Sequence, residues 1–447
     1  MTGHRWSAGL IALVLLAAAC SSQAADDSSS GGGGGGGGGD DGSGDAASDG
    51  GTPIDGITDD TINVSFIGAD FAALAEAGLA PDLGDMTVTI PVLVDDINEN
   101  GGIGGRQINL TLDLVDGTAG PDVGRAACIK ATEEDDAAVV FVSPAISRDI
   151  VRCTSVQQQT ITIGMPGWDD PLYEEAEGRL FSVGSQTSMG TYRNTAVWAD
   201  VLDQAGELEG KTIGVVTSDD FEALAAGTEQ ALVPHLEELG YEVVEFAVLP
   251  CPEGDTDCEQ HEPTMQTFKD AGVDLVFMNA GALAGPALFA AATSLDYHPQ
   301  WVTCCNSITD TVVQFAAGSF DQLDGTFGVS TTFAQRSEEA EACNQIVRDR
   351  TDEDYATESD AYGFTGVNCI ALLVFRDAMD TIDGPVTEAA LIGGIEGLET
   401  VPSLEGIPGT IGPDKHDAGD AVFLAQFTTE AGEYLPVDDE EPIEAPA

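Results

Sequence analysis

The sequence predicts an α/β protein with two lobes, each built on a mostly parallel sheet flanked by helices. Strand and helix patterns alternate along residues 57–438, which is typical of parallel sheets covered by helices. This part of about 380 residues exceeds the length at which a single core usually divides. The alternation restarts after Gly184, as expected where a second sheet begins.

In the first half, the spacing of apolar residues predicts each element. Ile90, Leu93, Val94 and Ile97 recur at helical spacing, whereas Ile108–Leu114 alternates apolar and polar residues as a strand does. The expected elements are strand Thr61–Gly68, a helix around Ile90–Ile97 that ends at Gly101 and Gly102, strand Ile108–Leu114, helix Asp122–Glu134, strand Ala137–Val142, helix Ser147–Gln158 and strand Thr160–Met165.

The second half repeats this alternation and ends differently. The expected elements are helix Met189–Gln204, strand Thr212–Thr217, helix Phe221–Leu239, strand Glu242–Leu249, helix Glu262–Ala271, strand Asp274–Asn279, helix Pro286–Ala292 and strand Gln300–Thr303. Near the end, Ala421–Thr428 and Glu433–Val437 flank Glu430–Gly432, which predicts a terminal hairpin.

Residues 1–19 predict a lipoprotein signal peptide. His4 and Arg5 give a positive start, Leu10–Leu16 is an apolar run too short to span a bilayer, and three alanines precede Cys20. After cleavage, Cys20 would be N-terminal and could carry acyl chains. An ordinary secretory leader with an incidental Cys20 is the alternative.

Residues 20–56 predict a disordered tether between this lipid anchor and the folded part. They are rich in Gly, Ser and Asp and include the run Gly31–Gly39, so they cannot bury apolar area. Together the anchor and tether predict an extracytoplasmic protein held at the outer face of the cell membrane.

The chain is expected to cross between the lobes near Gly184, Val329 and Gly409. Lobe 1 then comprises residues 57–184 plus 331–409, and lobe 2 comprises residues 185–330 plus 410–438. Residues 439–447 are expected to form an acidic tail.

The charge is strongly negative, with 78 acidic and 15 basic residues and a net charge of −63. This composition excludes a nucleic-acid partner, because no basic stripe is present to neutralise phosphates. Cation binding and a surface adapted to salt are the two remaining interpretations. The acidic residues lack the spacing of a calcium loop, so neither a metal nor another cofactor is expected.

Nine cysteines are present, and the eight beyond Cys20 predict disulfide bonds in an exported chain. We expect Cys128–Cys153 to join the helices on either side of strand Ala137–Val142. We expect Cys251–Cys258 to close a short loop and Cys343–Cys369 to join adjacent helices of one lobe. Cys304 and Cys305 would then be bridged to each other; two free thiols, or bridges to Cys343 and Cys369, are the alternatives.

The carboxyl ends of the predicted strands are where a ligand is expected, because open parallel sheets bind ligands at that edge. These ends lie at Gly68–Phe71, Ser143–Ser147, Met165–Trp168, Ser218–Phe221, Asn279–Ala282 and Cys304–Asn306. A purely structural role is the alternative at three of these positions. Ser147 could cap a helix, and Trp168 and Phe221 could pack against the hydrophobic core.

The segment Asp95–Leu110, DDINENGGIGGRQINL, resembles the periplasmic binding proteins of the leucine/isoleucine/valine-binding type. These are the substrate-binding components of ABC transporters for amino acids, amides and related molecules. The resemblance covers nearly all of residues 57–438, through SPAISRDIVRC, TITIGMPG, TIGVVTSDDFEALAAGTEQAL, VDLVFMNAG, HPQWVTCCNS and LDGTFGVS in the family's order. It implies the two-lobed type I periplasmic-binding-protein fold.

The resemblance also implies where a ligand binds. In the family, hydroxyl and backbone N–H groups of two loops hold the ligand's carboxylate, and these loops match Ala145–Ser147 and Pro166–Trp168. Phe221 matches a family tyrosine, and Cys305 stands where the family has the acid that grips the ligand's ammonium. The candidate ligand-binding residues are Phe71, Ala145, Ser147, Pro166, Trp168, Phe221, Gly281, Cys305 and Asn306.

An enzyme is not expected, because the sequence contains no G-x-S-x-G, H-E-x-x-H or P-loop lysine motif. The expected function is capture of a small polar solute, such as an amino acid, an amide or a short carboxylate, in the cleft between the lobes. The expected partners are that ligand, the permease and ATPase subunits of an ABC importer, and the membrane through lipid on Cys20. A ligand-sensing receptor module without a transporter is the alternative.

Overall fold

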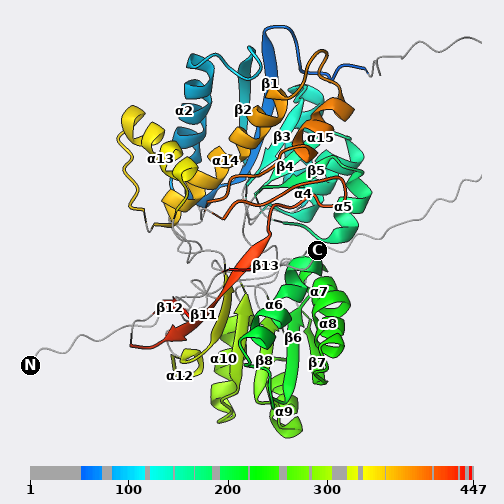
Figure 1. Cartoon of the computed structure of the whole chain (residues 1–447), viewed down its shortest axis with the longest axis vertical. Coiled ribbons are helices and arrows are strands. Elements are labelled where there is room, and N and C mark those ends of the chain that lie inside the picture. The colour runs from blue at the N-terminus through cyan, green and yellow to red at the C-terminus, as the bar shows by residue number, and fades with distance from the viewer. Residues whose placement is uncertain are drawn as a thin grey trace, which may run out of the picture. The chain divides into compact units, whose positions relative to one another are not determined.

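The chain forms two α/β sheets with separate cores, as the fold prediction expected (Figure 1). The computed structural model describes residues 52–72, 83–115, 121–143, 146–165, 167–183, 192–219, 222–250, 259–280, 284–304, 320–330, 336–357, 359–404, 407–430, 433–437 and 442–444. The predicted signal peptide, Cys20 and most of the predicted tether lie outside these residues. The last five residues of the predicted tether, 52–56, are described: Pro53 forms a bridge with Thr387, and the N–H of Ile54 donates to the carbonyl of Val386 at 3.0 Å. The prediction of disorder is therefore wrong for these five residues.

Lobe 1, named here for the sheet that begins with β1, has five parallel strands in the order β2-β1-β3-β4-β5. Its strands are β1 (Thr61–Ala69), β2 (Gln107–Val115), β3 (Val139–Val142), β4 (Ile161–Gly164) and β5 (Leu180–Ser182). Its helices are α2 (Met86–Glu99), α3 (Pro121–Ile129), α4 (Arg148–Arg152), α5 (Asp170–Ala176), α13 (Glu338–Arg350), α14 (Asp360–Asp380) and α15 (Glu388–Glu396).

Lobe 2 has its strands in the order β12-β11-β10-β9-β8-β6-β7, parallel from β10 to β7, with the short β13 paired to β11. Its strands are β6 (Ile213–Ser218), β7 (Val243–Leu249), β8 (Leu275–Asn279), β9 (Gln300–Cys304), β10 (Phe327–Ser330), β11 (Ala421–Thr428), β12 (Glu433–Pro436) and β13 (Ile443–Glu444). Its helices are α6 (Tyr192–Gln204), α7 (Glu222–Gly227), α8 (Val233–Glu238), α9 (His261–Ala271), α10 (Ala284–Ser294) and α12 (Phe320–Leu323).

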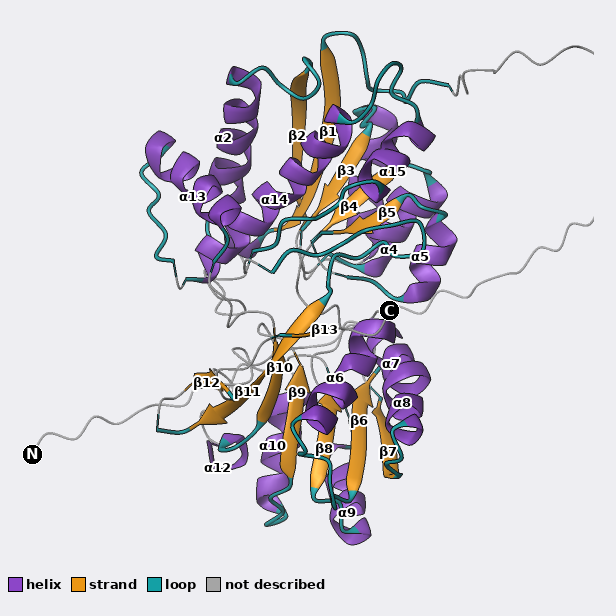
Figure 2. Cartoon of the chain, viewed as in Figure 1, coloured by secondary structure: helices purple, strands orange, loops and turns teal. Residues whose placement is uncertain are grey.

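The terminal hairpin is confirmed, because β11 and β12 pair in antiparallel fashion. The structure adds three short strands that the sequence analysis did not expect. They are β5, at one edge of the first sheet, β10, which lies between β9 and β11, and β13, which lies within the predicted acidic tail. Figure 2 shows helices flanking the strands of each sheet.

The core of lobe 1 forms around strands that are buried on both faces. Every residue of β3 and β4 is buried, as expected when helices cover both sides of a parallel sheet. Phe66 of β1 stacks on Phe141 of β3 with ring centroids 5.6 Å apart, and Phe375 of α14 meets Phe141 edge-on at 5.9 Å. The sheet and its longest covering helix therefore share one apolar core.

The predicted end of the first helix is confirmed at Gly102, which follows α2. This residue has a φ of +73°, and a Cβ there would lie 1.9 Å from the carbonyl oxygen of Arg106. Only glycine adopts such a conformation at no steric cost and leaves room for this close approach. The turn returns the chain to β2 beside β1.

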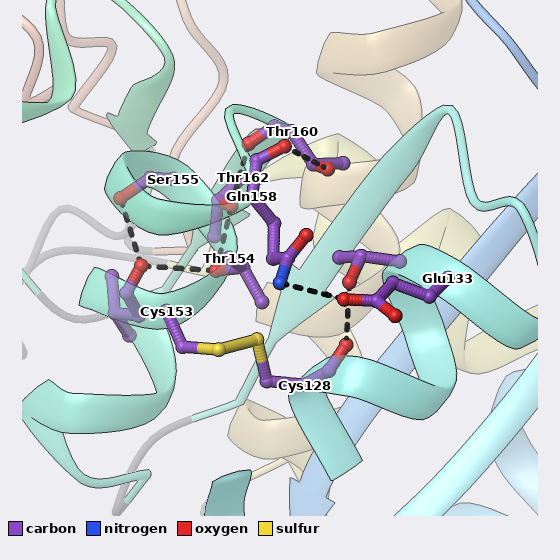
Figure 3. Close-up of a disulfide and its surroundings, with 10 residues drawn as sticks. Cys128, Glu133, Cys153, Thr154, Ser155, Gln158, Thr160 and Thr162 are labelled. Atoms are coloured by element: carbon purple, nitrogen blue, oxygen red, sulfur yellow. Dashed lines mark hydrogen bonds between the residues drawn. A yellow bond between two sulfur atoms is a disulfide. The ribbon is translucent and has the colours of Figure 1, made fainter. Parts of the chain in front are cut away.

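The disulfide Cys128–Cys153 joins the helices that follow β2 and β3, as the sequence analysis expected (Figure 3). Each of these helices ends in a π-helical turn, Lys130–Glu134 and Cys153–Gln157. A hydrogen bond from Gln158 Nε2 to Glu133 Oε1, 3.1 Å long, joins the two turns again. The expected Cys343–Cys369 disulfide is also present and joins α13 to α14. The expected Cys251–Cys258 pair lies outside the described residues.

We expect replacement of both Cys128 and Cys153 by alanine to lower the free energy of unfolding by about 3–4 kcal/mol, because the closed loop restricts the unfolded chain. The cysteines are 25 positions apart in sequence. Urea unfolding measures the change. Gln158→Ala, which removes only the exposed hydrogen bond beside the disulfide, should cost about 0.5 kcal/mol or less. Equal losses in the two variants would contradict the prediction.

Candidate functional site

The candidate site in lobe 1 lies at the carboxyl ends of three neighbouring parallel strands, β1, β3 and β4. The loops that follow these strands carry Phe71, Ser147 and Trp168, the three candidate residues that the structure describes. Because parallel strands end at the same edge of a sheet, these loops emerge on one side of lobe 1.

Ser147 precedes α4 in the position of a helix cap, but its side chain does not cap the helix. Its carbonyl oxygen accepts a hydrogen bond from the N–H of Ile150 at 3.1 Å, while its hydroxyl has no hydrogen-bond partner among the described residues. The residue is exposed. The capping role considered from the sequence is therefore not realised, and the hydroxyl remains available to a ligand.

Close packing between α3 and α4 positions Ser147. A Cβ on Gly124 of α3 would lie 2.6 Å from Ile150 Cγ1 and 3.8 Å from Ser147 Oγ. Real side chains essentially never approach as closely as the first distance. Glycine at position 124 therefore lets α3 approach the start of α4, and Cys128 then bonds covalently to Cys153 one helical turn further along.

Trp168 lies in the loop after β4 and is 9% exposed. Its backbone N–H donates to the hydroxyl of Tyr173 at 3.3 Å. Its indole ring belongs to the lobe 1 core, so the structural role considered from the sequence is real. The indole Nε1, however, is buried without a hydrogen-bond acceptor in the described structure. A buried donor that lacks an acceptor is costly, and a ligand at this edge would supply one.

An ion pair joins the loops of Ser147 and Trp168 through the next residue of each loop. Arg148 Nε donates to Asp169 Oδ2, and Arg148 Nη2 donates to Asp169 Oδ1, both at 2.7 Å. The Asp169 side chain is 5% exposed and also caps α5 by accepting from the N–H of Leu172 at 3.1 Å. This two-point contact holds the two loops in a fixed relation. The sequence analysis missed this pair because its partners are far apart along the chain.

The loop of Trp168 is also held from β5. The Tyr173 hydroxyl donates to Ser182 Oγ at 2.6 Å, and burial raises the pKa of Tyr173, so the phenol stays neutral. The Ser182 backbone N–H donates to the carbonyl of His416 at 2.8 Å, and Ala418 N–H donates to the Ser182 carbonyl at 2.8 Å. Residues 416–418 thereby extend the sheet past β5.

Phe71 packs against α14 at the end of β1. Its ring is 9% exposed and meets the ring of Phe364 edge-on, with centroids 5.1 Å apart. This contact gives the site edge of lobe 1 an apolar aromatic component beside the polar donors of the other two loops.

Six other candidate ligand-binding residues lie outside the described residues: Ala145, Pro166, Phe221, Gly281, Cys305 and Asn306. Of the two adjacent cysteines, Cys304 is the last residue of β9.

The site edge of lobe 2 contains a buried polar group that the sequence analysis missed. Asn279, the last residue of β8, donates from Nδ2 to Thr228 Oγ1 at 2.8 Å, and its carbonyl accepts from Thr217 Oγ1 at 2.7 Å. All three residues are fully buried, and Asn279 Oδ1 has no hydrogen-bond partner in the described structure. The available signal was an asparagine at the end of an otherwise apolar strand, LVFMN.

In the described ranges, no three His, Cys, Asp or Glu side chains are grouped so that they could hold a metal ion. None of the helices in the same ranges combines the length and apolar character needed to cross a membrane.

We expect Asp169→Asn to lower the free energy of unfolding by about 1–2 kcal/mol, because it breaks a largely buried ion pair while asparagine preserves the helix cap. Urea unfolding provides the measurement. The matched control is Arg152→Gln, which breaks the exposed Arg152–Glu175 pair and should change stability by about 0.5 kcal/mol or less. A loss for Asp169→Asn no larger than that of the control would refute the role given to this pair.

Comparison with known proteins identifies the family. The family model described as periplasmic binding protein matches residues 78–433. No curated protein sequence matches the chain.

Several solved structures share the fold. The leucine-, isoleucine-, valine-, threonine- and alanine-binding protein from Brucella ovis aligns with a TM-score of 0.62 at 15% identity, covering 86% of this chain and 95% of that one. A solute-binding protein from R. palustris in complex with 4-hydroxybenzoate aligns with a TM-score of 0.62 at 15% identity, covering 86% of this chain and 98% of that one. A fatty acid ABC transporter substrate-binding protein from Thermomonospora curvata aligns with a TM-score of 0.58 at 17% identity, covering 89% of this chain and 96% of that one.

Similarities at these low identities demonstrate a common fold and leave the ligand open. The family model, in contrast, covers well over half of the chain. The chain therefore belongs to the periplasmic binding protein family, whose members bind solutes for ABC transporters outside the cytoplasm and are not enzymes.

Proposed function

We propose that this protein is the membrane-tethered substrate-binding component of an ABC importer and captures a small polar solute between its lobes. The solute would be an amino acid, an amide or a short carboxylate. The observation that carries the ligand class is a pair of donors on neighbouring loops, the Ser147 hydroxyl and the Trp168 indole N–H, which have no acceptor among the described residues. A carboxylate or amide oxygen is the acceptor that such donors suit.

The charge of the chain supports recognition by neutral donors. Basic residues number only 15 in the whole sequence, and Arg148, next to Ser147, is already paired with Asp169. A ligand oxygen at this edge would therefore be held by hydroxyl and N–H groups. Fixed donors of this kind bind an anion without a counter-charge when several of them converge.

Cys305 narrows the proposed ligand class further. It stands where the resembling family has the acid that grips an ammonium group, and neither a thiol nor a disulfide balances that charge. If Cys304 and Cys305 are bridged to each other, ligands without a free α-ammonium are favoured. Amides and short carboxylates should then bind more tightly than leucine or valine.

Membrane attachment would come from lipid on Cys20, with residues 21–51 as the tether. The run Gly31–Gly39 within it cannot bury apolar area, which supports a linker role. An anchored body stays close to the permease and ATPase subunits that the proposal requires as partners.

A thermal-shift screen of amino acids, amides, urea and short carboxylates tests the ligand class. A solute that binds only the folded protein raises the unfolding midpoint in a concentration-dependent way. If no member of this panel raises the midpoint, the proposed ligand class is wrong.

We expect Ser147→Ala to weaken binding of the best ligand of that screen by about 10–100-fold, because a hydrogen bond to a charged or strongly polar oxygen is lost. Unfolding without ligand should be unchanged, since the hydroxyl has no hydrogen-bond partner among the residues that the structure describes. Ser359→Ala is the matched control, because Ser359 does cap its helix by accepting from Tyr362 N–H. It should lose about 1 kcal/mol of stability at unchanged affinity. Isothermal titration that gives both variants the same affinity would contradict the assignment.

Cys20→Ser should move the protein from the membrane fraction to the soluble extracytoplasmic fraction, because the thiol that carries the acyl chains is lost. Fractionation and incorporation of labelled fatty acid measure this change. Ser21→Ala, one residue further along, should leave the distribution unchanged. Retention of the Cys20→Ser protein on the membrane would show that another feature anchors it.

A further inference from the structure

Strand β7 carries an exposed apolar stripe at the edge of the lobe 2 sheet. Val244, Phe246 and Val248 are 37%, 36% and 41% exposed, and they alternate along the strand so that all three lie on one face. They are three of the five large apolar side chains that are exposed in the described residues. β7 pairs with β6 on one side, and no described strand pairs with its other side.

The other sheet edges in the described structure are protected in ways that β7 is not. The exposed residues of β2 are the polar Gln107 and Asn109. The edge at β5 is extended by residues 416–418, through the bridge between Ser182 and Asp417. β12 is four residues long. A seven-residue edge with an apolar face, such as β7, is the kind that pairs with another chain.

The sequence of β7 is complementary to itself in one antiparallel register. When Phe246 of one copy lies opposite Phe246 of a second copy, Val244 lies opposite Val248 and Glu245 lies opposite Ala247. This register pairs all residues from Val243 to Leu249. Shifting the centre by one residue to Glu245 would place two carboxylates directly opposite each other, which is unfavourable.

We propose that two copies of this chain associate through β7 in this antiparallel register, so that their lobe 2 sheets become one continuous sheet about a two-fold axis. The two-fold symmetry makes each contact occur twice, as in other self-complementary interfaces. The backbone groups on the side of β7 that no described strand pairs would find partners, and the two apolar stripes would lie side by side on one face. The glutamate of the strand faces an alanine.

The association is weak and strengthens with salt. A contact built on one strand pair has a small area, at the low end for specific interfaces. Each copy also carries a net charge of −63, so mutual repulsion opposes the pairing until salt screens it. An interface held by ion pairs would respond in the opposite direction.

Sedimentation of the full chain tests the association. We expect a concentration-dependent dimer at about 0.1 mM protein whose fraction increases between roughly 0.1 M and 1 M NaCl. Phe246→Asp should weaken self-association at least about tenfold, because it places a charge on the stripe and next to its own symmetry mate. The matched control is Val123→Asp, at an exposed valine on α3 of lobe 1. It should leave the dimer unchanged.

Cysteine cross-linking tests the register and does not rely on a destabilising charge. Phe246→Cys places two thiols opposite each other across an antiparallel pair, within the Cα distance that a disulfide spans. Mild oxidation should therefore give a covalent dimer that reducing agent reverses. Glu245→Cys should not cross-link, because its symmetry mate lies diagonally across the pair on the opposite face from Phe246. The wild-type chain, treated in the same way, controls for cross-linking through the native cysteines.

Either of two results would overturn the proposal. One is a monomer at every protein and salt concentration, even if β7 then binds a different protein. The other is a dimer that Phe246→Asp leaves intact or that Glu245→Cys cross-links as readily as Phe246→Cys, because such a dimer uses another surface or register.

Discussion

Burial of the parallel strands on both faces is the constraint on which the rest of this structure depends. β3 and β4 have no exposed residue, so each must be followed by a helix that returns the chain across the sheet. The parallel strands of a sheet then end at the same edge, and the loops that lead from them into helices start there. The candidate site is a consequence of this geometry, because Phe71, Ser147 and Trp168 are carried by three such loops.

The loops at this edge are held by contacts that do not use the candidate binding groups. Arg148 and Asp169 join the loops of Ser147 and Trp168, and Gly124 lets α3 approach the start of α4. The hydroxyl of Ser147 and the indole N–H of Trp168 therefore have no hydrogen-bond partner within the described part of the chain, while their backbones are fixed. Donors that are already in place need little reorganisation when a ligand arrives, which favours binding.

The strong negative charge affects the two proposed surfaces differently. At the site edge, the scarcity of basic residues leaves recognition of an anionic or polar oxygen to neutral donors. At β7, the same charge opposes association, and the apolar stripe of Val244, Phe246 and Val248 supplies the attraction. The net charge of −63 would keep the protein soluble at low salt despite this exposed edge, because repulsion between copies is then least screened.

Local periodicity by itself determined most of the fold. Strands such as Ile108–Leu114 and helices such as the one around Ile90–Ile97 follow from the spacing of apolar residues, which depends only on neighbours in sequence. Two of the three expected disulfides, Cys128–Cys153 and Cys343–Cys369, are also present, because the predicted helices already placed those cysteines near one another. The short strands β5, β10 and β13, of three, four and two residues, were not predicted, since a pattern of period two needs more residues to be recognised.

Only the tertiary structure decided what the residues at the site edge do. A serine before a helix is a normal cap by sequence, and its failure to cap at Ser147 depends on how α4 begins. The Arg148–Asp169 pair and the buried Asn279–Thr228 contact join residues 21 and 51 positions apart, a separation that local patterns do not encode. The self-complementarity of β7 is present in its sequence, but its exposure is not, because a strand becomes an edge only through the order of its sheet.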